Sequence, residues 1–224
     1  MLRTVTQYGG AEATRLGIRL LLLTGVRTGE LRAATPDQFD LDKGIWLVPP
    51  EGVKQLRSRV RTQGNEIPPY VIPLSTQAIA IVQRLIQLRA RGARYLLVHR
   101  YEAQEMISEN TLNTAISRMG YKGRLTGHGI RATISTALNE VGFVEEWIEA
   151  QLSHSDPNQV RAAYNHAEYV EPRRSMMQYW ADLLDALEGE VSPPKPDAYM
   201  AQIGLAPAGF LGSQLEYGDS SMRC

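Results

Sequence analysis

The sequence has very little cysteine and no long apolar run. Its single cysteine, Cys224, is the last residue, which excludes a disulfide within the chain and a metal cluster built on cysteines. The most apolar stretch, from Leu20 to Val26, is far shorter than the roughly 20 residues that a membrane-spanning helix needs. The N-terminus shows no signal-peptide pattern. We therefore expect a soluble, cytoplasmic protein without a membrane partner.

The chain also lacks a net charge of either sign, because 24 Lys and Arg residues balance 24 Asp and Glu residues. Overall neutrality argues against nucleic acid as a partner, since phosphates are neutralised by cations. The distribution is uneven, however: basic residues dominate between Lys54 and Arg124, and acidic residues prevail between Glu140 and Glu190. A basic region of this kind can hold DNA locally, although most charge runs are solvated surface.

Several common catalytic motifs are missing. The four histidines form no HExxH or Cys/His ligand spacing, so we expect no metal site. The sequence has no GxxxxGK[ST] loop for a nucleoside triphosphate and no GxSxG elbow of a hydrolase. We therefore expect chemistry that uses neither a metal nor any other cofactor.

With 224 residues, 43% of them hydrophobic, the chain can build one sizeable core. Two short strands, 45–48 and 70–74, are predicted to flank a polar and basic excursion, and 95–99 is a candidate third strand. The prolines after residue 190 indicate an extended linker. The spacing of apolar residues, with Ser75 and Ser108 as caps, predicts helices over 12–23, 76–91, 109–119, 128–138, 145–152 and 173–187.

Two arginines stand in distinctive local settings. Arg27 follows a glycine turn and precedes Glu30 by three residues, so the carboxylate could support the guanidinium from one helix face. Taken alone, an ordinary surface ion pair is the commoner explanation. His128 and Arg131 stand at i and i+3 at a helix start, which suits an anion, although a lone His-x-x-Arg is common.

His154 and Tyr164 are weaker candidates when each is taken alone. His154 ends a short helix, where a cap that interacts with the helix dipole is the ordinary alternative. Tyr164 is one of ten tyrosines. Asp156 as N-cap, Pro157 and Gln159 predict a helix that carries Tyr164 about two turns from its start.

The order and context of these residues, taken together, favour a functional site over the ordinary explanation of each residue alone. Together they resemble the Arg, Lys, His-x-x-Arg, His, Tyr signature of the tyrosine recombinases, or phage-type integrases, over about Ala11 to Leu187. Phrases such as VRAAYN and MMQYW look especially like P4-type prophage integrases. The matching residues are Arg27 in TGVRTGEL, Lys54, His128 and Arg131 in HGIR, His154 in LSHS, and Tyr164.

The resemblance implies an α+β, mainly α-helical catalytic-domain fold with a small antiparallel β-sheet over residues 1–190, followed by a tail over 191–224. It implies site-specific DNA recombination, for integration or excision, through a 3′-phosphotyrosyl intermediate and without metal or ATP. Double-stranded DNA attachment sites, a homo-tetramer on DNA and accessory directionality factors are the implied partners.

The same resemblance implies a role for each residue. Tyr164 would be the nucleophile, and Arg27 and Arg131 would bind the non-bridging phosphate oxygens as charge develops there. His128 would accept the phenol proton. His154 would donate a hydrogen bond to the phosphate.

The excursion between the two predicted strands departs from the family pattern. It looks longer than the usual hairpin, and Tyr70 stands where relatives often have His. Lys54 would protonate the leaving 5′-oxygen if it lies on this hairpin. Arg57, Arg59 and Arg61 are predicted phosphate contacts, with a solvated loop as the alternative. As a second departure, we expect the DNA-binding domains that normally precede the catalytic domain in the family to be absent here.

Three alternatives remain. A type IB topoisomerase uses similar residues to cut and reseal one strand. A catalytically idle DNA-binding integrase remnant would show no covalent chemistry. Metal-free, RNase-like hydrolysis by His128 and His154 would give a 2′,3′-cyclic RNA product that does not depend on Tyr164.

Overall fold

The computed structural model describes residues 1–57, 60–61, 67–153 and 169–202. Across the described residues, every helix is too short or too polar to traverse a bilayer. The helices are α1 (Leu2–Thr6), α2 (Glu12–Thr24), α3 (Thr28–Arg32), α5 (Thr76–Leu88), α6 (Thr111–Ile116), α7 (Gly127–Val141), α8 (Glu145–Leu152), α10 (Val170–Gly189) and α11 (Asp197–Ala201). The strands are β1 (Phe39–Asp40), β2 (Ile45–Val48) and β3 (Tyr70–Pro73), and the shorter turns are η1 (Pro36–Gln38), η2 (Pro50–Gly52) and η4 (Ser117–Tyr121).

The three strands form one antiparallel sheet in the order β1-β2-β3. In the central strand β2, Trp46 and Val48 are buried while Ile45 and Leu47 are only partly covered, as alternation in a half-buried strand requires. The register pairs Val48 with Tyr70, so the excursion leaves and returns at the same end of the sheet. The predicted pairing of 45–48 with 70–74, and with it the mainly helical α+β fold class, is confirmed.

The predicted strand at 95–99 is wrong. This stretch makes one isolated bridge, between Val98 and Met106, and the Leu96 amide donates instead to the carbonyl of Ala34. Leu96 and Leu97 are both buried. Its apolar residues therefore reflect burial of a loop in the core rather than pairing in a sheet.

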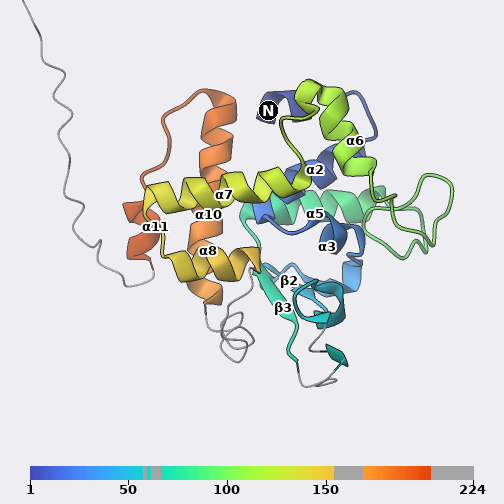
Figure 1. The fold of residues 1–224 in the computed structure, drawn as a ribbon, viewed down its shortest axis with the longest axis horizontal. Helices are drawn as coiled ribbons and strands as arrows, with labels where there is room; N and C mark the ends of the chain where they lie inside the picture. The colour runs from blue at the N-terminus through green and yellow to red at the C-terminus, as the bar shows by residue number, and fades with distance from the viewer. Residues whose placement is uncertain (58–59, 62–66, 154–168, 203–224) are drawn as a thin grey trace, which may run out of the picture.

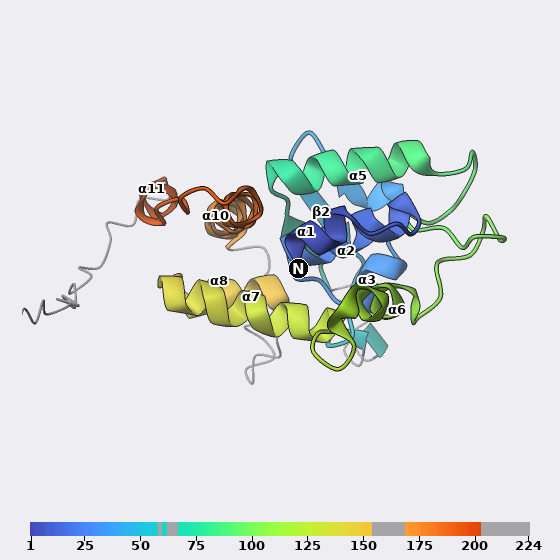
Figure 2. The ribbon, with the colours of Figure 1, turned by 90° about the horizontal axis from the view of Figure 1, so that it is seen from above.

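Helix α2 runs through the middle of the molecule, with α5 on one side and α6 and α7 on the other (Figures 1 and 2). Ile18 and the consecutive residues Leu20 to Leu23 are all buried. A helix that buries consecutive positions must be covered on all its faces. The end of α2 is therefore held firmly, and the candidate site lies just beyond it.

The predicted helix ends are partly confirmed. Ser75 caps α5 by accepting a hydrogen bond from the Ala78 amide, but α5 ends at Leu88 rather than near residue 91. Ser108 is not a cap, because its hydroxyl bonds the side chain of Thr111 and α6 begins only there. The helix predicted to reach residue 119 passes into the π-helical turn η4 after Ile116.

Part of the C-terminal tail is helical. Pro193, Pro194 and Pro196 precede α11, which lies beside α10 (Figure 2). The Tyr199 ring packs edge-on against Tyr179 with a centroid separation of 5.4 Å. Its hydroxyl donates to Asp182 Oδ2 at 2.6 Å, and this bond helps to raise the pKa of Tyr199 to about 12. Tertiary contacts therefore hold a helix that its five residues would not sustain alone.

Candidate active site

Four of the six predicted catalytic residues lie among the described residues, and all four line one hollow of about 710 Å³. They come from three separate places in the chain: the turn between α2 and α3, the excursion between β2 and β3, and the first turns of α7. Thr28, Gln55 and Gly127 complete the lining, and sequence reasoning singled out none of these three. The predicted residues that the hollow brings together are Arg27, Lys54, His128 and Arg131.

Arg27 is held from two directions. Its Nη1 donates to Glu30 Oε1 at 3.0 Å, and its Nη2 donates to the Ser153 carbonyl at 2.9 Å. The second carboxylate oxygen, Glu30 Oε2, accepts from the Arg27 amide at 2.8 Å. The Glu30 side chain is only 2% exposed, so this is not the ordinary surface ion pair that its spacing alone suggests.

Arg131 lies deeper than Arg27 and is 3% exposed. Its two terminal nitrogens donate to the carbonyls of Gly25 and Leu152. Burial, and next the nearby charge of Arg27, lower the pKa of Arg131. A guanidinium has so high a pKa that this side chain still carries its charge near neutral pH. Because this cation is fixed and buried, solvent screens its charge less than it would screen an exposed side chain.

The turn at Gly25 brings the end of α8 close to Arg131. Gly25 has φ of +67°, and a Cβ at this position would stand 2.7 Å from Leu152 Cδ2 and 3.3 Å from Ile134 Cδ1. A residue with a side chain would have to displace the side chain of Leu152, a residue whose carbonyl binds Arg131. Glycine is thus required here both by backbone conformation and by packing.

We expect Gly25→Ala to lower the free energy of unfolding by about 2–4 kcal/mol, from the left-handed backbone and from overpacking together. Gly142→Ala is the matched control, because Gly142 also has positive φ, +94°, but has nothing within 4 Å of its Cβ position. Gly142→Ala should lower the free energy of unfolding by about 1–2 kcal/mol. Urea unfolding measures both, and equal losses at the two positions would contradict the close approach of α8.

His128 lies on the first turn of α7, with an exposed side chain. Thr126 caps this helix by accepting from the Gly129 amide, and Asn113 accepts from the Gly127 amide at 2.9 Å. A Cβ on Gly127 would stand 2.3 Å from Thr28 Cγ2, so the start of α7 touches the residue that follows Arg27. These contacts bring the imidazole to the rim where Arg27 lies.

Lys54 follows β2 in the turn that opens the excursion, and its side chain is exposed. Val53 and Leu56 on either side of it are buried, which anchors the turn against the core. Gln55, beside Lys54, also lines the hollow, and within the described residues its buried Oε1 has no hydrogen-bond partner. The buried residues on either side thus hold the turn in place, while the Lys54 ammonium is exposed at the hollow.

His154, Tyr164 and Arg59 lie outside the described residues. The chain is described up to Ser153, which is buried and has φ of 47°, and again from Tyr169. Because Arg27 binds the Ser153 carbonyl, the residue directly before His154 is fixed at the hollow.

The other predicted DNA contacts lie apart from the hollow. Arg57 and Arg61 are exposed on the excursion, and neither lines it. Arg57 Nε donates to the Glu51 carbonyl at 3.2 Å, which helps to hold the loop. Both remain predictions as phosphate contacts.

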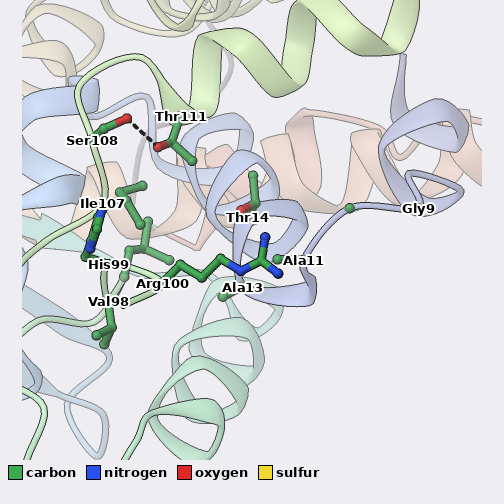
Figure 3. Close-up of a pocket in the computed structure, with 12 residues that line it drawn as sticks. Gly9, Ala11, Ala13, Thr14, Val98, His99, Arg100, Ile107, Ser108 and Thr111 are labelled. Atoms are coloured by element: carbon green, nitrogen blue, oxygen red, sulfur yellow. Dashed lines mark hydrogen bonds between the residues drawn. The ribbon is translucent and has the colours of Figure 1, made fainter. Parts of the chain in front are cut away.

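A second hollow of about 610 Å³ lies at the opposite end of α2, next to Ala11 and Thr14 (Figure 3). Arg100 reaches across it, and the Ser108 and Thr111 hydroxyls bond each other at its side. None of the predicted catalytic residues lines this hollow. A helix of 13 residues, about 20 Å long, separates it from the site.

Comparison with known proteins gives consistent matches. The model of the Phage integrase family matches residues 3–171. The integrase of Enterobacteria phage P4 is 41% identical over 190 residues, which cover 82% of this chain and 43% of that protein. Putative protein IntB of Escherichia coli (strain K12) is 40% identical over 197 residues, which cover 83% of this chain and 48% of that protein. The chain thus spans about half the length of these curated relatives.

Solved structures show the same fold. The integrase from mycobacterium phage Brujita has a TM-score of 0.58 at 16% identity, over 79% of this chain and 54% of that chain. The XerA recombinase structure has a TM-score of 0.53 at 19% identity, over 75% and 56% of the two chains. Likeness at such low identity supports the fold alone. Together with the family match and two relatives at 40% identity or more, it shows that this chain belongs to the phage integrase family.

Proposed function

We propose that this chain is the catalytic part of a site-specific DNA recombinase that cuts and rejoins strands through a bond between Tyr164 and a 3′-phosphate. The observation that supports this best is the single hollow shared by four residues of the family signature from three separate parts of the chain. The two guanidiniums are already oriented there by a buried carboxylate and by backbone carbonyls.

The cations of the hollow suit a phosphodiester. A guanidinium can bind two oxygens through parallel hydrogen bonds, and both arginines would face the non-bridging oxygens as negative charge builds on them. Donors fixed before the reaction cost no reorganisation when that charge develops. Arg131 gains further strength from its burial, since little water screens it.

The remaining residues would move protons. A phenol has a pKa of about 10 and attacks phosphorus well only when a base accepts its proton. His128 would be that base, and His154 would donate a hydrogen bond to a phosphate oxygen. The Tyr164 oxygen forms the new P–O bond while the P–O5′ bond breaks, and Lys54 protonates the leaving 5′-oxygen.

This exchange keeps a phosphoester at every stage, so rejoining by attack of a second 5′-hydroxyl requires neither ATP nor a metal. A structurally similar protein, the Tn1549 transposon integrase, has been solved in complex with circular intermediate DNA, at a TM-score of 0.51. The proposed partner here is a double-stranded DNA attachment site, bound by a homo-tetramer. We include accessory directionality factors among the proposed partners.

The experiment that tests the proposal traps the covalent product. The protein is incubated at low salt, which strengthens DNA binding, with nicked duplexes of randomised sequence whose short 5′-hydroxyl fragment diffuses away after cleavage. We expect a protein–DNA adduct joined through a 3′-phosphate, in which mass spectrometry places the nucleotide on Tyr164. No adduct, or an adduct on another residue, would overturn the proposal.

The same preparation separates the alternatives. Relaxation of a supercoiled plasmid without exchange between two DNA molecules would indicate a topoisomerase. Cleavage of RNA to 2′,3′-cyclic ends would indicate acid–base hydrolysis instead.

A further inference from the structure

Arg173 contacts residues on both sides of the segment 154–168, in which His154 and Tyr164 lie. It is fully buried in the first turns of α10. Its Nε donates to the Tyr169 carbonyl at 3.2 Å, directly after the segment. Its Nη1 donates to Gln151 Oε1 at 3.5 Å, three residues before His154. One guanidinium therefore links the two ends of this segment.

Gln151 is itself fixed by buried partners. Its Nε2 donates to the Thr24 carbonyl at 2.9 Å, at the end of α2, and its own carbonyl accepts from the Tyr70 hydroxyl of β3. Thr24, Tyr70 and Gln151 are each at most 1% exposed. Buried polar groups are costly to leave unpaired, so such a cluster favours a single arrangement.

The cluster adjoins the hollow. The two residues after Gln151 are Leu152 and Ser153, whose carbonyls bind Arg131 and Arg27. The last turn of α8 is therefore bonded to Arg173 through Gln151 and to both site arginines through its next two carbonyls. A shift of this turn would move the site arginines with it.

We propose that Arg173 is a positioning residue that clamps the two ends of the segment 154–168 and fixes their separation beside Arg27 and Arg131. This inference rests on the proposed roles of Tyr164 and His154. Arginine suits the task because its planar fork donates in two directions from one rigid group. Burial lowers the pKa of Arg173 to about 10, which reflects the cost of placing a cation here. Since apolar side chains often replace buried charges without loss of stability, stability alone does not call for arginine.

The test compares Arg173→Met with Arg174→Met. Arg174 is the neighbouring residue, but it bonds Glu171 and the Gly44 carbonyl instead of the segment's ends. Misplacement by about 1 Å costs about 100-fold in rate, so we expect a fall of that order in the single-turnover rate constant of Arg173→Met at saturating DNA. DNA affinity should stay within about twofold, and Arg174→Met should match the wild type.

The rate constant separates positioning from folding. A merely destabilised protein would form less adduct at the wild-type rate, whereas a misplaced segment forms the adduct slowly in every molecule. Arg173→Lys keeps the charge and a single donor nitrogen, and it should recover part of the rate. A wild-type rate constant in Arg173→Met would overturn the proposal.

A second measurement does not depend on catalysis. Hydrogen exchange at the amides of Leu152 and Ser153 should be at least about tenfold faster in Arg173→Met, while exchange in the middle of α7 stays unchanged. Absence of any wild-type adduct would refute the proposed function and leave this measurement valid. Unchanged exchange at the end of α8 would refute the clamp, whatever the activity.

Discussion

Replacing Tyr164 by Phe is expected to abolish the covalent protein–DNA product. Phenylalanine keeps the ring and its packing but removes the oxygen that would form the bond to phosphorus. Removal of the nucleophile from an enzyme that works through a covalent intermediate costs at least about 10⁴-fold in rate. The rate is measured as the single-turnover appearance of adduct on the nicked duplex at low salt. Thermal unfolding of the variant should match that of the wild type.

Tyr169→Phe is the matched control for this prediction. Tyr169 lies five residues after Tyr164, and its backbone carbonyl, rather than its ring, accepts the bond from Arg173. We expect its adduct rate to stay within about twofold of wild type. An adduct that persists in Tyr164→Phe, or that is lost equally in Tyr169→Phe, would refute Tyr164 as the nucleophile.

Arg131→Lys is expected to lower the single-turnover rate by about 10²–10³-fold, the loss typical of removing one donor to a developing oxyanion. Lysine keeps the positive charge. Its single nitrogen, however, cannot hold the carbonyls of Gly25 and Leu152 together and also bind a phosphate oxygen in the guanidinium's geometry. The expected loss of rate therefore comes from the changed geometry of the donors rather than from a change of charge.

A stability measurement separates the structural task of Arg131, which is to bind two buried carbonyls, from its task at the phosphate. Arg131→Ala leaves both buried carbonyls without this donor, at about 1–3 kcal/mol for each, so urea unfolding should show a clear loss. For the rate of Arg131→Lys, the matched control is Arg32→Lys, because Arg32 binds the Ile107 carbonyl at 2.9 Å outside the hollow. Arg131→Lys at the wild-type rate would contradict a role for this guanidinium at the phosphate.

The local parts of the site were predictable from the sequence. Arg27 and Glu30 are three residues apart, and their ion pair forms within the first turn of α3. The predicted helix 145–152 matches α8, and the helix predicted over 128–138 lies within α7. Such features depend on contacts within about one helical turn, where residue type and spacing decide the outcome.

Features that depend on distant partners were not predictable in the same way. Ser108 has the right type for a helix cap, but its hydroxyl bonds Thr111 instead. Residues 95–99 have the composition of a strand, yet their amides find partners such as Ala34 in a loop. Each local pattern is compatible with two outcomes, and packing against the rest of the chain selected one.

The sequence by itself determined the residue types of the site and their order, because the chemistry of a phosphate requires cations, imidazoles and a nucleophile of defined kinds. Only the tertiary structure decided that Arg27, Lys54, His128 and Arg131 share one hollow. It also revealed the buried cluster of Arg173 with Gln151 and Tyr70, for which the sequence offers no signal. The physical reason is that these contacts join segments far apart in the chain, whose approach is set by burial of the whole core.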